Sequence, residues 1–216
     1  MAWQEHITLF HFPTTSALLS IAVLGSVLAP NFYPDRFFLY LIQIFLGGSV
    51  AANHLDELVD RPWRTTMSRT RLWSVAIAAL SAFIAIGSYL AFKVDWIFIF
   101  FVVVESFFIV AYDLEIMGGI FHNVNTLGIS WGLVFLGGYY LQHQLLSPLV
   151  VVVSLGLCLC SMQGITLYER GKRYGKDRYH TDHDSRISWI TLRAGIFSVN
   201  LVTLIMIAYR FSLLPW

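Results

Sequence analysis

Residues 72–92 read LWSVAIAALSAFIAIGSYLAF, a run of 21 residues without a charged side chain. As an α-helix this run would be about 30 Å long, which is the thickness of the hydrocarbon core of a membrane. A helix also satisfies its own backbone hydrogen bonds, as lipid requires. The run therefore predicts a transmembrane helix.

The composition of the whole chain agrees with a membrane protein. Of its 216 residues, 57% are hydrophobic and 12% are charged, whereas soluble domains carry about 25% charged residues. The net charge of +1 gives no electrostatic attraction to nucleic acid. Motifs for nucleotide binding and for hydrolase chemistry are absent from the sequence. We expect an integral membrane protein that binds no nucleic acid.

Apolar segments of membrane-spanning length recur along the chain, with no soluble domain between them. We expect an all-α, polytopic transmembrane bundle of about seven helices that forms a single domain over residues 1–216. The segments lie near residues 14–30, 36–52, 72–92, 95–112, 124–142, 145–163 and 187–209. The sizeable polar loops between them are 53–71 and 164–186.

Basic residues indicate how the bundle is oriented. Seven helices place the N-terminus and the loops after the second, fourth and sixth helices on one side. Of the 14 Lys and Arg, four lie in 61–71 and seven between Arg170 and Arg193. Because basic residues collect on the cytoplasmic side, we expect the N-terminus and both polar loops to be cytoplasmic.

A cluster of acidic residues follows the second segment. If that helix continues, Asn53, Asp56 and Asp60 share one face, at positions i, i+3 and i+7. Carboxylates stacked in this way repel one another, and a hard divalent cation such as Mg²⁺ offsets the repulsion through oxygen ligands. Alternatively, four basic residues nearby neutralise the acids in a solvated loop. These are Arg61, Arg64, Arg69 and Arg71.

This motif resembles the first aspartate-rich motif of the UbiA superfamily of membrane prenyltransferases. The family pattern is N-x-x-x-D-x-x-x-D, and here Asn53 lies one residue closer to Asp56, while Asp56 and Asp60 keep their spacing. The resemblance extends over most of the chain. It includes Tyr112 at the end of the fourth segment and Asn125-x-x-Gly128-x-Ser130-Trp131-Gly132 at the start of the fifth.

The resemblance implies a second acidic motif after the sixth segment. Asp177 and Asp184 are the candidates there, and Asp184 precedes Thr191-Leu192 much as in the family. The upstream part of that motif is degenerate. A positively biased cytoplasmic loop without a site therefore remains an alternative.

Two further departures from the family concern charge and length. The loop after the fourth segment has no base, although the family commonly uses Lys or Arg there to bind diphosphate. Arg64, Arg69, Arg170 and Lys172 are the candidates to supply that charge. The family has nine transmembrane helices, so we expect a shorter bundle that lacks the last two.

The resemblance implies an enzyme, a prenyltransferase that binds a prenyl diphosphate through Mg²⁺ and prenylates a lipophilic, aromatic acceptor. Asp56 and Asp60, assisted by Asn53, are the expected catalytic residues. Asp56, Asp60, Asp177 and Asp184 are the expected metal ligands. Two alternatives stay open: a terpene cyclase of the same fold, and a non-catalytic structural or assembly subunit of a membrane complex.

One acid lies apart from both motifs. Glu105 is in the middle of the fourth segment, and an ionisable residue at membrane depth is a functional candidate by default. It either faces a cavity or is hydrogen-bonded within the bundle.

Overall fold

The described part of the chain is built from helices and contains no strand. The computed structural model describes residues 9–59, 61–176 and 183–212, apart from the side chains of residues 169, 171–176 and 183–185. The elements in chain order are α2 (Phe12–Leu28), α3 (Pro34–Phe45), the π-helix η1 (Leu46–Ala51), α4 (Ala52–Val59), α5 (Arg69–Lys93), α6 (Phe98–Asp113), the short α7 (Ile116–Gly119), α8 (Val124–His143), α9 (Pro148–Lys176) and α10 (His183–Ser212). The all-α prediction is confirmed.

Several of these helices are long and apolar enough to cross a membrane. Four described stretches meet both criteria: Pro34–Val59, Arg69–Lys93, Pro148–Tyr168 and Arg186–Ser212. Phe12–Leu28 is apolar but shorter. Each of the seven predicted segments falls on a helix, and the number that spans the membrane stays a prediction.

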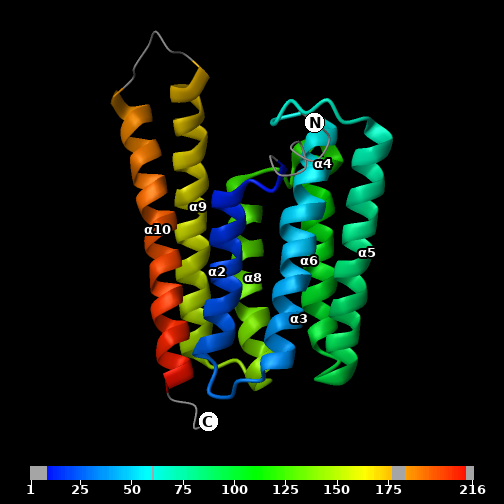
Figure 1. Cartoon of the computed structure of the whole chain (residues 1–216), viewed down its shortest axis with the longest axis vertical. Helices are drawn as coiled ribbons and strands as arrows, with labels where there is room; N and C mark the ends of the chain where they lie inside the picture. Colours follow the sequence, from blue (N-terminus) through cyan, green and yellow to red (C-terminus); the bar gives the residue numbers. More distant parts are fainter. Residues whose placement is uncertain (1–8, 60, 177–182, 213–216) are drawn as a thin grey trace.

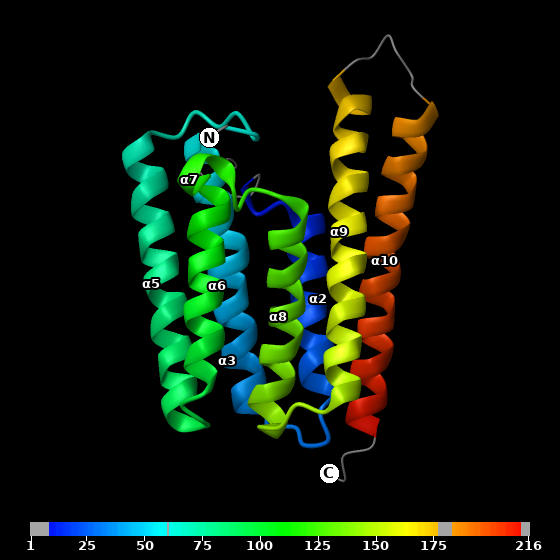
Figure 2. The ribbon, with the colours of Figure 1, turned by 180° about the vertical axis from the view of Figure 1, so that it is seen from behind.

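Two groups of helices lie side by side (Figures 1 and 2). In one group, α2 and α9 pack on α8, and α10 packs on α2 and α9. In the other, α3, η1, α4 and α6 all contact α5. Helix α8 joins the groups because it also packs against α6 and α3.

The polar segments meet at one end of the bundle. The C-terminal end of α4, the start of α5, the C-terminal end of α9 and the start of α10 all lie at the same end (Figure 1). Helices α9 and α10 reach beyond the others there in both views. At 1.5 Å per residue, the 29 residues of α9 span about 43 Å, more than the hydrocarbon core of about 30 Å.

Glycines allow α2 and α8 to approach closely. A Cβ added at Gly25 of α2 would overlap the backbone carbonyl oxygen of Phe135 in α8. A Cβ at Gly138 of α8 would lie 2.7 Å from the carbonyl oxygen of Ala22 in α2. Small residues at helix crossings are the usual means of close packing in lipid, where the hydrophobic effect does not drive helices together.

Polar side chains attach α10 to α2. The Ser20 hydroxyl donates to Oδ1 of Asn200 at 2.7 Å, and Nδ2 of Asn200 donates to the Ser16 hydroxyl at 3.2 Å. One turn further along α10, Thr203 Oγ1 lies 3.5 Å from the Ser20 carbonyl oxygen. Since α10 is little buried in the bundle, these bonds add polar contacts to its packing on α2 and α9.

The Gly25→Ala variant should be less stable than the wild type, by about 1–3 kcal/mol, which is the usual cost of overpacking. The added methyl group meets backbone, and backbone cannot rotate away. Unfolding in detergent, followed by circular dichroism, measures the effect. Gly156→Ala is the matched control, because nothing lies within 4 Å of a Cβ at Gly156. Equal stabilities of the two variants would contradict the proposed close crossing.

The Asn200→Leu variant should loosen α10 from α2. Hydrogen bonds between membrane helices are worth about 0.6 kcal/mol on average, so losing two should cost about 1 kcal/mol. The measurement is the unfolding free energy in mixed micelles. Ser198→Ala is the control, since the Ser198 hydroxyl bonds only within its own helix, to Ala194. A cost no larger than that of the control would argue against polar attachment of α10.

Candidate functional site

The first acidic motif lies on α4, immediately after the π-helix. Asn53 and Asp56 are both half-buried there, and Asp60 falls outside the described residues. The π-helix packs tightly, because a Cβ at Gly47 would overlap the Phe83 ring and one at Gly48 would overlap Leu18. Single π-helical turns inside longer helices are often found at functional sites.

Glu57, next to Asp56, has a structural role that the sequence did not indicate. Its carboxylate is fully buried. It accepts hydrogen bonds from the Trp63 backbone N–H at 3.0 Å, from the Thr65 backbone N–H at 2.7 Å and from the Thr65 hydroxyl at 2.9 Å. Glu57 therefore holds the loop between α4 and α5, which carries Arg61 and Arg64, against the end of α4.

The candidate diphosphate-binding residues are spread over α5, α9 and the loop that precedes α5. Arg64 is exposed in the loop before α5, with a left-handed backbone (φ 51°). Arg69 is exposed at the start of α5 and donates to the Leu58 carbonyl oxygen at 3.1 Å. Arg170 is exposed on α9, and the side chain of Lys172 lies outside the described part.

The second acidic motif is not tested by the structure. Asp177 lies outside the described residues, and Asp184 is described only in its backbone, near the start of α10.

The His11 ring connects α9 with the loop between α4 and α5. The His11 ring lies 4.5 Å from the Trp63 ring and 5.7 Å from the Tyr168 ring, between centroids.

The structure places a second acid near Asp56 that the sequence analysis did not select. Asp113 ends α6 and is only 8% exposed. Helix α6 packs against α4, and the charges of Asp56 and Asp113 interact. The nearness of these two residues depends on helix packing, so sequence spacing could not reveal it. Two carboxylates from different helices thus lie near each other at the polar end of the bundle.

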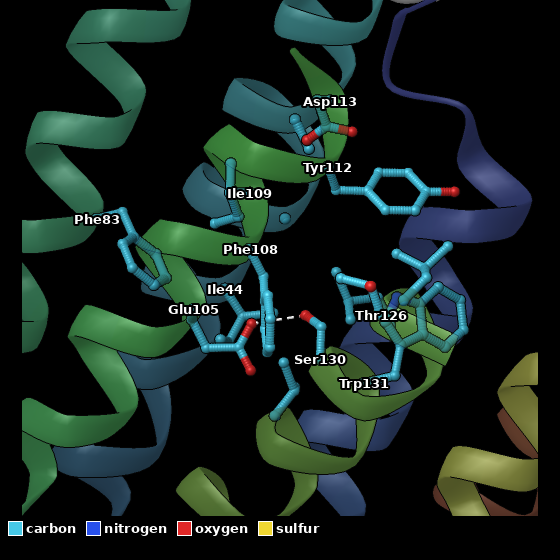
Figure 3. Close-up of a pocket in the computed structure, with 15 residues that line it drawn as sticks. Ile44, Phe83, Glu105, Phe108, Ile109, Tyr112, Asp113, Thr126, Ser130 and Trp131 are labelled. Carbon is cyan, nitrogen blue, oxygen red and sulfur yellow. Dashed lines mark hydrogen bonds between the residues drawn. The ribbon is translucent and has the colours of Figure 1, made fainter. Parts of the chain in front are cut away.

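A cavity of about 60 Å³ opens beside Asp113 and continues between α6 and α8 (Figure 3). On α6, the lining residues Glu105, Ile109, Tyr112 and Asp113 follow helical spacing and share one face. Tyr112, Ser130 and Trp131 come from the stretches that resemble the family, and all three line the cavity. The glycines of the second stretch serve packing instead, since Cβ atoms at Gly128 and Gly132 would meet Met162 and Cys158 of α9.

The structure shows that the two placements considered for Glu105, facing a cavity and hydrogen-bonded within the bundle, hold together. It lines the cavity, and its Oε2 accepts a hydrogen bond from the Ser130 hydroxyl at 2.7 Å. The carboxyl is 5% exposed, and Oε1 has no hydrogen-bond partner.

Oxygen donors fit a hard cation at the polar end of the cavity. The described residues contain no group of three or more His, Cys, Asp or Glu placed to hold a metal. Asp56 and Asp113 supply carboxylates, and the nearby Asn53 supplies an amide oxygen. Mg²⁺ typically takes one or two carboxylates from the protein and completes its shell with water and substrate phosphate. The residues present therefore fit such an ion.

A solved structure aligns with nearly the whole chain. It is the "Structure of a UbiA homolog from Archaeoglobus fulgidus bound to Cd2+", with a TM-score of 0.61 and 13% sequence identity. This chain has a UbiA fold. The alignment covers 98% of this chain and 80% of the UbiA homolog. No family model and no curated protein sequence matches the chain.

Within this UbiA fold, Glu57→Gln should loosen the loop between α4 and α5. Glutamine has one oxygen acceptor for three donors, and hydrogen bonds to a charged group are worth about 1.5–3 kcal/mol each. Limited trypsin digestion measures the effect, because cleavage after Arg64 should become several times faster. Glu115→Gln is the control, since the side chain of Glu115 lies beside His122 instead of the described part of that loop. An unchanged cleavage rate would show that Glu57 does not anchor the loop.

Proposed function

We propose that the protein is a Mg²⁺-dependent membrane prenyltransferase, which transfers an isoprenoid from its diphosphate to a lipophilic acceptor. The observation that carries this proposal is the neighbouring pair Asp56 and Asp113, with Asp113 lining an apolar cavity in a UbiA fold. A diphosphate needs compensating cations, whereas its isoprenoid tail needs an apolar environment. The acids of α4 and α6 would hold the cation, and the apolar residues that line the cavity would surround the tail.

Asp56, Asp113 and Asn53 are the described residues proposed to hold the metal. Asp60, Asp177 and Asp184 are proposed as further ligands from the sequence pattern. The bound ion would stabilise negative charge on the leaving diphosphate. The UbiA homolog that aligns with this chain was bound to Cd²⁺, which supports a divalent cation site in this fold.

Basic side chains are proposed to bind the rest of the diphosphate charge. Arg64, Arg69 and Arg170 are exposed, and Lys172 is added from the sequence. Arg69 would have to exchange its hydrogen bond to the Leu58 carbonyl oxygen for a bound anion. This arrangement would place the diphosphate group of the substrate at the polar end of the bundle. We propose that this end is cytoplasmic, in keeping with its basic residues.

The reaction needs one bond broken and one bond made. The allylic C–O bond breaks, and its electron pair leaves with the diphosphate. An electron pair of the acceptor then forms a bond to the allylic carbon, and the acceptor releases a proton. Aromatic side chains such as Phe108, Tyr112 and Trp131 line the cavity, where their ring faces can stabilise the cation and exclude water.

Substrate binding requires the cavity to widen. Its volume is about 60 Å³, while small-molecule sites usually measure about 300–1,000 Å³. The lining side chains or helices must therefore move apart when an isoprenoid enters.

The test is binding of farnesyl diphosphate to the purified protein in nanodiscs, with and without Mg²⁺. We expect Mg²⁺-dependent binding that weakens roughly tenfold or more in Asp56→Asn, Asp60→Asn and Asp113→Asn, because each removes a proposed charge partner of the bound ion. Asp35→Asn is the matched control, since Asp35 begins α3 at the opposite end of the helix and pairs with Lys93.

Other outcomes would contradict the proposal. If the protein binds no diphosphate and co-purifies with partner subunits, it is a structural or assembly subunit. If it converts farnesyl diphosphate to a cyclic hydrocarbon without an acceptor, it is a terpene cyclase.

A further inference from the structure

Glu105 is a buried acid that diphosphate binding does not require. It lies eight residues before Asp113 on α6, and eight residues of α-helix rise about 12 Å. Glu105 is thus deep in the cavity, away from the proposed metal. Figure 3 shows its carboxyl group pointing toward α8, where Ser130 donates to Oε2.

The second oxygen of this carboxyl group lacks a partner. Oε1 is buried and makes no hydrogen bond, and leaving a buried polar group unpaired costs about 1–3 kcal/mol. No residue lining the cavity in the described part of the chain is basic. Among the residues that the structure describes, none donates a hydrogen bond to this atom.

The surroundings of Glu105 favour a ring. Phe83, Phe108 and Trp131 line the cavity with it (Figure 3). Aromatic side chains pack well against other rings, face to face with an offset or edge to face. The cavity therefore combines ring surfaces with one unsatisfied hydrogen-bonding oxygen.

We propose that Glu105 binds the hydroxyl group of a lipophilic phenol, which is the acceptor of the reaction. This inference rests on the proposed function. An isoprenoid tail has no polar atom to pair with Oε1, whereas a phenolic hydroxyl both donates and accepts. It can pair with Glu105 whether the carboxyl group is charged or neutral. The ring then extends from Glu105 toward Asp56 and Asp113, where the allylic carbon would lie.

A phenol would have to enlarge the cavity. A cavity that holds benzene measures about 150 Å³, more than the present 60 Å³. A cavity of the present size instead suits water, which could also pair with Oε1. The experiment must therefore separate a phenol site from a site for water.

The experiment compares 4-nonylphenol with nonylbenzene, which has the same ring and tail without the oxygen. Wild-type protein in nanodiscs is equilibrated with each compound, without Mg²⁺ or diphosphate, and the bound amount is corrected with empty nanodiscs. We expect nonylphenol to bind about 3–10 times more tightly than nonylbenzene, as one net hydrogen bond allows. Glu105→Leu and Glu105→Met should lose this preference, while Glu105→Gln, which keeps a hydrogen-bonding group, should retain most of it.

The proposal is overturned if the wild type shows no preference, as a water site predicts, or if folded Glu105→Leu and Glu105→Met keep it. Circular dichroism melting establishes that each variant is folded. Because no diphosphate is present, the result is independent of the test of the proposed function. A phenol preference without farnesyl diphosphate binding would leave the phenol site standing and remove only the prenyl donor.

Discussion

Where α2 crosses α8, glycines bring the two backbones into contact, and the rest of the bundle depends on this contact. Lipid provides no hydrophobic force between helices, so close packing and interhelical hydrogen bonds must hold them. Helix α8 then carries α9 on one side and α6 on the other. Because the cavity lies between α6 and α8, its shape depends on how closely α8 sits on α2. Gly25 does not line the cavity, yet it helps to set the dimensions of the site.

Much of the architecture could be predicted from the sequence, because membrane helices have a strong local signal. Runs such as 72–92 fixed the positions of the helices, and Asn53 and Asp56 indicated where polar chemistry gathers. The partner of Asp56 could not be predicted, since Asp113 is 57 positions away and reaches it only through packing of α6 on α4. Glu57 was equally hidden, because spacing does not tell which of two adjacent acids turns inward to bind backbone N–H groups.

Two buried glutamates show two ways of keeping an acid inside this protein. Glu57 is fully satisfied, because three donors from the next loop surround its carboxylate. Glu105 has one donor and one unsatisfied oxygen beside a cavity. The first arrangement contributes to stability, while the second costs stability unless a ligand completes it. The same side chain is thus structural in one place and a candidate binding group two helices away.

The π-helix sets the direction in which the acidic residues of α4 point. Each residue of an α-helix turns the chain by about 100°, and a π-helical turn holds one residue more than an α-helical turn. If all six residues of Leu46–Ala51 wound instead as regular α-helix, α4 would rotate by roughly that angle relative to α3. Asp56 would then face away from Asp113 with its own neighbours unchanged. The direction of the acidic motif is therefore set by how the turn upstream of it is wound.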